Sequence, residues 1–210
     1  MAALGAAFFF CQPATAQTDT TATQAAPQCE LHVWPSSGLR SVYYGWFHGG
    51  IVDGAVNGRD GYPPIPKDPV STSLQAELLS KLNLASILQL PNYQVVVHDQ
   101  SLDSRAIRAA AGRLSTSTSS CYAELVGDDV FFQQDVFSGG YLKSLIRFRS
   151  FGSSNAPTRV FSTWSRTKLI AFPPKEDAGN AEALRELHAA YVSNIESFGT
   201  FLNKPIKKKK

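Results

Sequence analysis

Two short motifs carry residue types that take part in catalysis. His48 with Gly49 and Gly50 resembles the His-Gly-Gly oxyanion segment of esterases, whose backbone N–H groups stabilise a developing negative charge. The nucleophile elbow G-x-S-x-G that such enzymes need does not occur in the sequence. Ser165 and Lys168 have the S-x-x-K spacing of penicillin-recognising enzymes, but their segment alternates like a strand, which directs them to opposite faces. We therefore predict no catalytic residue.

Oxygen and nitrogen ligands for a metal ion are present but poorly spaced. Counting an EF-hand loop from Asp53 puts Ala55 and Pro64 at positions that require oxygen ligands. The remaining histidines are scattered: His32, His98 and His188. Neither G-x-G-x-x-G nor a phosphate-binding Gly-Lys-Ser/Thr ending occurs. The sequence predicts no metal site, no nucleotide and no other cofactor.

Asp128 and Asp129 are the only adjacent pair of carboxylates within a segment of strand character. Neighbouring positions of a regular strand face opposite sides of a sheet, which argues against paired-carboxylate catalysis. With Gly127 before them, we expect a bulge or bend whose carboxylates are solvated.

A long segment rich in glycine, proline and aromatic residues extends over residues 43–69. Long irregular segments within a domain are often functional, and this one carries aromatic side chains rather than a catalytic set. The predicted partner-binding residues are Tyr44, Trp46, Phe47 and Tyr62. The alternative is that these rings cover the sheet as part of the core.

The first residues of the chain resemble a secretory signal peptide. Residues 1–10 are apolar, and Ala14 and Ala16 form an A-x-A site, which predicts a signal peptide over 1–16 cleaved before Gln17. A positively charged start is missing, so a start further upstream stays open. Lipidation of Cys11 is the alternative, disfavoured because bulky phenylalanine precedes it.

Removal of the signal leaves two cysteines, Cys29 and Cys121. An even number of cysteines in an oxidising compartment predicts a disulfide, here between the first strand and the central one. The alternative is two buried thiols that do not meet.

Composition is that of one domain without a membrane span. Hydrophobic residues make up 43% and charged residues 18% of the 210 residues. The formal charge of +3 includes four terminal lysines, without which it is about −1. We expect a flexible leader over 17–28, a domain over 29–203 and a basic tail over 204–210, with no nucleic-acid partner and no transmembrane segment.

Hydrophobic periodicity predicts strands and helices in mixed order. Strands are expected within 29–34, 43–47, 92–99, 121–133, 141–151 and 158–172, and helices within 72–90, 105–114 and 180–202. Thr72 and Gln75 have capping-box spacing. The last helix carries an apolar stripe: Leu184, Leu187, Tyr191, Ile195, Phe198 and Leu202. The expected fold is α+β, a single mixed β-sheet with about three helices packed on it.

One predicted strand has a basic face. In "YLKSLIRFRSF", apolar residues alternate with Lys143, Arg147 and Arg149, the pattern of a half-buried antiparallel strand.

The order of elements resembles a known group of periplasmic domains. The succession "STSLQAELLSKL...YQVVVHDQSLD...AIRAAAGRL...CYAELVGDDV" is similar to the amino-terminal domain of TolB and to related domains of CsgG-type and penicillin-binding-protein-activator lipoproteins. The resemblance covers residues 29–202 and is architectural. It implies an envelope interaction or secretion module without catalysis.

We therefore expect an exported, noncatalytic cell-envelope interaction module, located in the periplasm or secreted. Its expected partner is an envelope protein or polymer. The alternative function is an exported hydrolase with its site at the glycine-aromatic segment. The identity of the partner and the oligomeric state are left open.

Overall fold

A mixed six-stranded sheet runs through the residues that can be described. The computed structural model describes residues 29–44, 65–135, 138–175 and 180–205. The elements are β1 (Cys29–Trp34), β2 (Arg40–Tyr44), α1 (Thr72–Ser80), α2 (Leu84–Ile87), β3 (Tyr93–Val97), α3 (Ser104–Ala109), β4 (Tyr122–Asp135), β5 (Gly139–Gly152), β6 (Arg159–Leu169) and α4 (Asn180–Leu202). The predicted α+β class with one mixed sheet is confirmed.

The long strand β4 is the centre of the sheet. The strand order is β3-β1-β4-β5-β6, with β5 and β6 antiparallel to their neighbours. β1 pairs in parallel with the first part of β4 (Tyr122–Val126), and β2 pairs in parallel with its last part (Phe131–Asp135). β1 and β2 therefore act as two halves of one interrupted strand along the same side of β4.

The interruption between β1 and β2 coincides with a bulge in β4. The register with β5 shifts between Gly127 and Asp129, as the sequence predicts. A Cβ atom on Gly127 would lie only 2.9 Å from the backbone nitrogen of Ser36. The buried Gln75 of α1 accepts hydrogen bonds from the Ser36 backbone N–H (3.0 Å) and hydroxyl (2.8 Å). The buried side-chain amide of Gln75, with its hydrogen bonds formed, thus fixes α1 to the segment between β1 and β2.

The helix expected over 72–90 is two helices. Ser71 caps α1, so the capping box expected at Thr72 and Gln75 is wrong. Gln75 instead accepts hydrogen bonds from Ser36, between β1 and β2. Asn83 caps α2 through a bond from the Ser86 backbone N–H to its side-chain oxygen (3.1 Å). Because asparagine at this position can satisfy free N–H groups of a new helix, the chain starts a second helix here.

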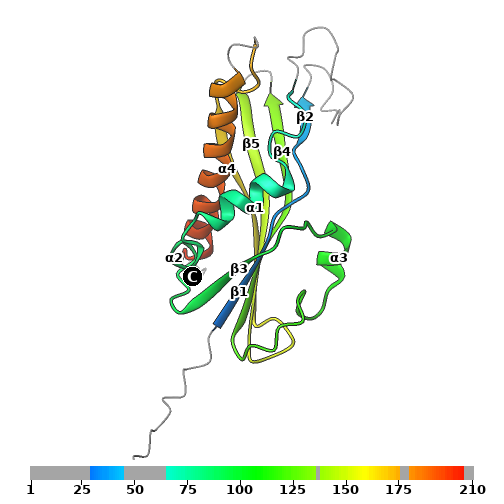
Figure 1. Cartoon of the computed structure of the whole chain (residues 1–210), viewed down its shortest axis with the longest axis vertical. Helices are drawn as coiled ribbons and strands as arrows, with labels where there is room; N and C mark the ends of the chain where they lie inside the picture. Colours follow the sequence, from blue (N-terminus) through cyan, green and yellow to red (C-terminus); the bar gives the residue numbers. More distant parts are fainter. Residues whose placement is uncertain (1–28, 45–64, 136–137, 176–179, 206–210) are drawn as a thin grey trace, which may run out of the picture.

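α4 covers the inner face of β5 and β6 (Figure 1). Most of the predicted stripe is buried, with Leu187 and Phe198 fully enclosed, whereas Leu184 is only half-buried. The buried Asn194 donates to the Leu142 carbonyl (3.1 Å) and the Ser144 hydroxyl (3.0 Å). α4 is therefore fixed on β5 by polar as well as apolar contacts.

The two cysteines of the domain are bonded. Cys29 at the start of β1 and Cys121 just before β4 form a disulfide across a separation of 92 residues. This confirms the predicted link between the first strand and the central one. In the chain-entropy model, closing a loop of this length stabilises the fold by about 4 to 5 kcal/mol.

Within the described residues, no helix is both long and apolar enough to cross a membrane.

Burial of the α4 stripe predicts the cost of truncating it. Leu187 is 0% exposed, so Leu187→Ala should lower the free energy of unfolding by about 2 to 5 kcal/mol, measured by urea unfolding. The exposed Glu196 of the same helix offers a control, and Glu196→Ala should change stability by less than about 0.5 kcal/mol. Equal midpoints for the two variants would contradict the observed packing.

Candidate functional site

The outer face of the sheet, opposite α4, has a covered part and an open part. α3 and the following segment lie over β1 and the first part of β4, where Trp34, Ile107 and Val126 form a small buried cluster. The outer side chains of β6 are exposed by comparison, including Val160 and Trp164. The covered part contains the densest network of polar contacts, and the open part contains unpaired charge.

The centre of the covered part is the carboxylate of Glu124, whose side chain is 0% exposed. One oxygen accepts from the Leu114 backbone N–H (2.6 Å) and the Tyr122 hydroxyl (2.8 Å). The other accepts from Arg149 Nε (2.8 Å), and Arg149 Nη2 lies 2.6 Å from the same oxygen as an ion pair. Burial is the main cause that raises the pKa of Tyr122, so its hydroxyl stays protonated and donates. Both oxygens of this buried charge are therefore engaged, and their partners come from β4, β5 and the segment after α3.

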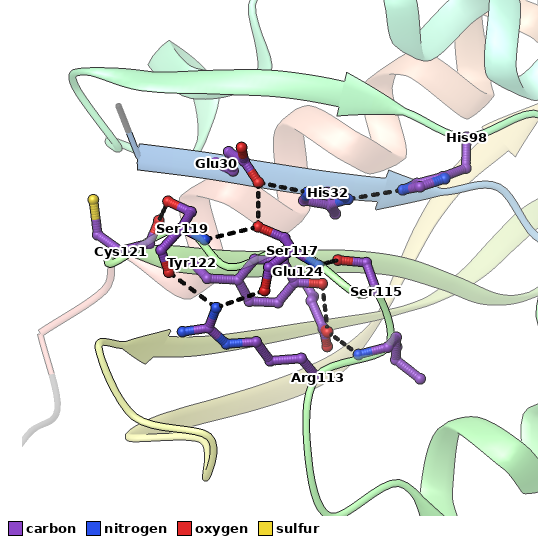
Figure 2. Close-up of polar contacts among 11 residues, drawn as sticks. Glu30, His32, His98, Arg113, Ser115, Ser117, Ser119, Cys121, Tyr122 and Glu124 are labelled. Carbon is purple, nitrogen blue, oxygen red and sulfur yellow. Dashed lines mark hydrogen bonds and ion pairs between the residues drawn. The ribbon is translucent and has the colours of Figure 1, made fainter. Parts of the chain in front are cut away.

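Arg113 fixes the covering segment at its other end (Figure 2). Its guanidinium donates to the carbonyls of Ser117 (3.0 Å) and Ser119 (2.9 Å) and to those of Gly152 and Ser154. It also lies 4.7 Å from the Tyr122 ring centroid. Because four backbone carbonyls use the donors of Arg113, this cation is structural.

Glu30, His32 and His98 form a chain along β1 and β3 (Figure 2). Parallel pairing places His32 beside Val96, and His98 follows β3 directly. His32 Nε2 lies 3.0 Å from the Glu30 carboxylate, and its Nδ1 lies 2.9 Å from His98 Nε2. When His32 is neutral, its Nε2–H donates to Glu30 and its Nδ1 accepts from His98. The Ser117 hydroxyl also donates to Glu30.

The charge states of Glu30 and His98 are set by their contacts. Hydrogen bonds from Ser117 and His32 hold the pKa of Glu30 below its usual value, so it is ionised near neutral pH. Burial, followed by the neighbouring His32, lowers the pKa of His98. The neutral form of His98 is therefore favoured in the folded protein.

The order of contacts in this chain differs from that of a serine hydrolase. A catalytic triad needs the serine hydroxyl to donate to an imidazole that a carboxylate orients. Here Ser117 and His32 both contact the same oxygen of Glu30, and no hydrogen bond joins the Ser117 hydroxyl to the His32 ring among the described contacts. The contacts instead tie the segment around Ser117 to β1 and β3, which is a structural role.

The covered network was missed by sequence reasoning because its members are far apart in the chain. His32 and His98 are separated by 66 residues, and only the parallel pairing of β1 with β3 brings them together. The expectation that the histidines are scattered is wrong for this pair. Among the described residues, no group of three or more possible ligands could hold a metal ion.

Asp128 and Asp129 are not solvated turn residues, which corrects that expectation. Both lie in β4 at the bulge. Asp128 pairs with Arg147 (2.7 Å from Nη2) and accepts from the Ser104 hydroxyl, whereas Asp129 pairs with Arg40. At the bulge both neighbouring carboxylates pair with cations, and Asp128 neutralises Arg147 of the basic face.

The open part of the outer face lies on β5 and β6. Lys143 is directly opposite Arg166, and Tyr141 is directly opposite Lys168. None of these three cations forms an ion pair within the described part of the chain. Like charges directly opposite one another destabilise a sheet, so the Lys143–Arg166 pair is an unfavourable arrangement in the isolated fold.

Aromatic rings are interleaved with these cations. Lys143 Nζ lies 5.5 Å from the Phe131 ring centroid and 5.7 Å from that of Trp164, and the two rings meet edge to face at 5.2 Å. Arg166 lies 5.5 Å from the Tyr141 ring centroid. Trp164 is 43% exposed. Exposed rings next to cations are typical of binding surfaces.

A hollow of about 230 Å³ separates the covered and open parts. Arg108, Arg147 and Arg149 line it with apolar neighbours. Arg147 and Arg149 already pair with buried carboxylates, so only Arg108 offers an unpaired charge there. The hollow is thus a weaker site for an anion than the open face.

The binding residues predicted from the glycine-aromatic segment fall almost entirely outside the described residues. Trp46, Phe47 and Tyr62 lie there, as does His48. The backbone of Tyr44 belongs to β2, where it pairs with Asp135. The role of these residues stays a prediction.

Ser165 and Lys168 lie on opposite faces of β6, as their strand pattern predicts. Ser165 is buried towards α4, whereas Lys168 is exposed on the outer face. The S-x-x-K spacing therefore does not bring the two side chains together.

Comparison with known proteins places this chain in no family. No family model and no curated protein matches the sequence. Among solved structures, the chain is similar to protein XCC0632 from Xanthomonas campestris, of family DUF330, with 9% identity, a TM-score of 0.42 and coverage of 85% of this chain and 86% of that chain. A second structure, an uncharacterized protein, has 10% identity, a TM-score of 0.35 and coverage of 84% and 93%. Neither similarity supports a conclusion about function, and the resemblance to TolB and CsgG stays a prediction.

Breaking the buried pair should destabilise the protein strongly. Arg149→Leu leaves the Glu124 carboxylate buried without its cation, and should cost about 3 to 5 kcal/mol in urea unfolding. Adding Glu124→Gln removes the unpaired charge and should recover part of this loss. An Arg149→Leu protein as stable as wild type would show that the pair does not hold the covered part together.

The lowered pKa of His98 predicts loss of stability in acid. The unfolded chain binds a proton at the ordinary value of about 6.5, whereas the folded chain binds it only at lower pH. The unfolding free energy should therefore fall as pH decreases from about 6.5 through the lowered pKa of His98. The groups facing His98 are His32, which opposes its charge, and Asp99, which favours it.

Urea midpoints measured at intervals between pH 7.5 and 5 would test this, with His98→Gln as the variant. Glutamine keeps an amide donor for His32 but does not titrate, so its profile should be flatter than that of wild type. Parallel profiles would mean that His98 does not contribute to the acid sensitivity.

Proposed function

We propose that this protein is an exported, noncatalytic module of the cell envelope that binds an envelope protein or polymer. The A-x-A site at Ala14 to Ala16 and the Cys29–Cys121 disulfide support export to an oxidising compartment. Periplasmic or extracellular localisation follows from that proposal.

The observation that carries the binding function is the open face of β5 and β6. Lys143 and Arg166 lie directly opposite one another without a carboxylate partner in the described residues. Proteins keep such locally unfavourable arrangements mainly at functional sites. The exposed Trp164 next to them supplies the ring type that most often dominates the energy of an interface.

The polar groups of the covered part support binding rather than catalysis. The Glu124 carboxylate accepts hydrogen bonds from Arg149, Tyr122 and the Leu114 backbone, and Ser117 donates to Glu30. These groups stabilise the fold and are not poised for proton transfer. The glycine-aromatic segment, with Trp46 and Tyr62, is a second proposed contact region.

Truncation of the exposed ring should weaken partner binding without unfolding the protein. We expect Trp164→Ala to weaken partner binding by about thirtyfold or more, which corresponds to a hot-spot residue, and so to reduce the crosslinked partner recovered from native envelopes. Its urea midpoint should stay close to that of wild type because the ring is already 43% exposed.

Lys81→Ala provides the control, since Lys81 lies at the end of α1 and, within the part of the chain that the structure describes, pairs only with Glu77 (2.5 Å). Trp46→Ala and Tyr62→Ala, tested in parallel, distinguish the open face from the glycine-aromatic segment. If Trp164→Ala captures as much partner as Lys81→Ala does, the open face is not the binding surface.

A further inference from the structure

We propose that the free edge of β6 binds an extended, acidic segment of a partner protein by strand addition. The proposal rests on the binding function proposed above and specifies the chemistry of the partner. It follows from three features of β6: an unpaired edge, a hollow that crosses this edge, and cations without carboxylates.

β6 is an edge strand. It contains 11 residues and, in the described part of the chain, pairs only with β5. In an antiparallel pair, alternate residues direct their backbone N–H and C=O groups away from the partner strand. β6 therefore presents a row of donors and acceptors that an extended peptide can use.

A hollow of about 480 Å³ lies beside this edge. Lys143, Trp164 and Arg166 line it from the outer face, and Ser197 and Phe201 line it from α4. α4 covers the inner face of the sheet, so a hollow touching both sets passes around the free side of β6. A strand added there would place alternate side chains towards Arg166 and towards Phe201.

The charge of the hollow selects an acidic segment. Among the described residues, no carboxylate lines it, and Lys143 and Arg166 are directly opposite each other. Lys168 continues the cationic row, and Lys204 stacks on the Phe201 ring at 4.7 Å. Carboxylates on an added strand would lie beside these cations and remove their mutual repulsion.

A second copy of this chain is a poor occupant of the same edge. Antiparallel pairing of β6 with β6 of another molecule brings Arg166 and Lys168 of both copies together in the registers centred on these residues, and like charges across a sheet are unfavourable. The favoured occupant alternates acidic residues, which face the outer cations, with apolar residues, which face Phe201.

The probe for this proposal is a synthetic nine-residue peptide that alternates glutamate with valine, added to the oxidised protein. Binding should slow hydrogen exchange at alternate amides of β6, those not bonded to β5. A peptide of equal charge with proline at two adjacent central positions loses at least one N–H that faces β6, because neighbouring residues direct their N–H groups to opposite sides, and should bind at least tenfold more weakly. A lysine-valine peptide should not bind.

Protein variants locate the site. Arg166→Glu and Lys168→Glu should each lower the affinity for the glutamate-valine peptide by about tenfold or more. Arg105→Glu, which makes the same change of charge on the exposed surface of α3, should leave the affinity within about twofold of wild type.

Several outcomes would overturn the proposal. Equal binding of the proline peptide, without protection of β6 amides, would mean that the cations attract anions without strand addition. Binding of vesicles of anionic lipid in place of the peptide would assign the face to a membrane surface. If the Trp164 variant loses its envelope partner while the peptide leaves β6 unprotected, the binding function stands and strand addition is wrong.

Discussion

The buried carboxylate of Glu124 is the constraint on which the outer face depends. A charge with no exposed surface is tolerated only when it is fully paired, and its donors come from Arg149 on β5, Tyr122 on β4 and the backbone of Leu114. The Leu114 bond requires the segment after α3 to lie over β1 and β4. Cys121 then holds the end of that segment at the start of β1. The buried charge thus acts with the Arg113 contacts and the Ser117–Glu30 bond to keep this part of the face covered.

Local patterns in the sequence were sufficient to predict most of the elements. Period-two alternation identifies β5 and β6, and the α4 stripe at spacings of three and four identifies the helix that covers them. Gly127 next to two aspartates identifies the bulge in β4. The disulfide was predictable from parity, since removal of the predicted signal leaves only Cys29 and Cys121. All these cues are either short-range or compositional.

The site was less predictable because it depends on strand register. Glu124 and Arg149 are 25 residues apart, and no periodicity shows that β4 and β5 place them opposite each other. The histidine pair likewise requires parallel pairing across an intervening helical region. The break between α1 and α2 was missed because the apolar periodicity continues through it, and the capping role of Asn83 is evident only from the bond to Ser86. At this position the N-cap residue Asn83, not the apolar periodicity, sets the start of a new helix.

Cations on an edge strand have two physical explanations, and β6 distinguishes them. Edge strands often carry lysine and arginine because charge prevents self-association, and the row of Arg166 and Lys168 does this for β6. Protection alone, however, does not require an exposed Trp164 or a hollow that reaches α4. It also gives no reason to set Lys143 opposite Arg166, where one cation would protect the edge at lower cost. The combination is better explained by an edge that rejects its own copies and accepts an oppositely charged strand.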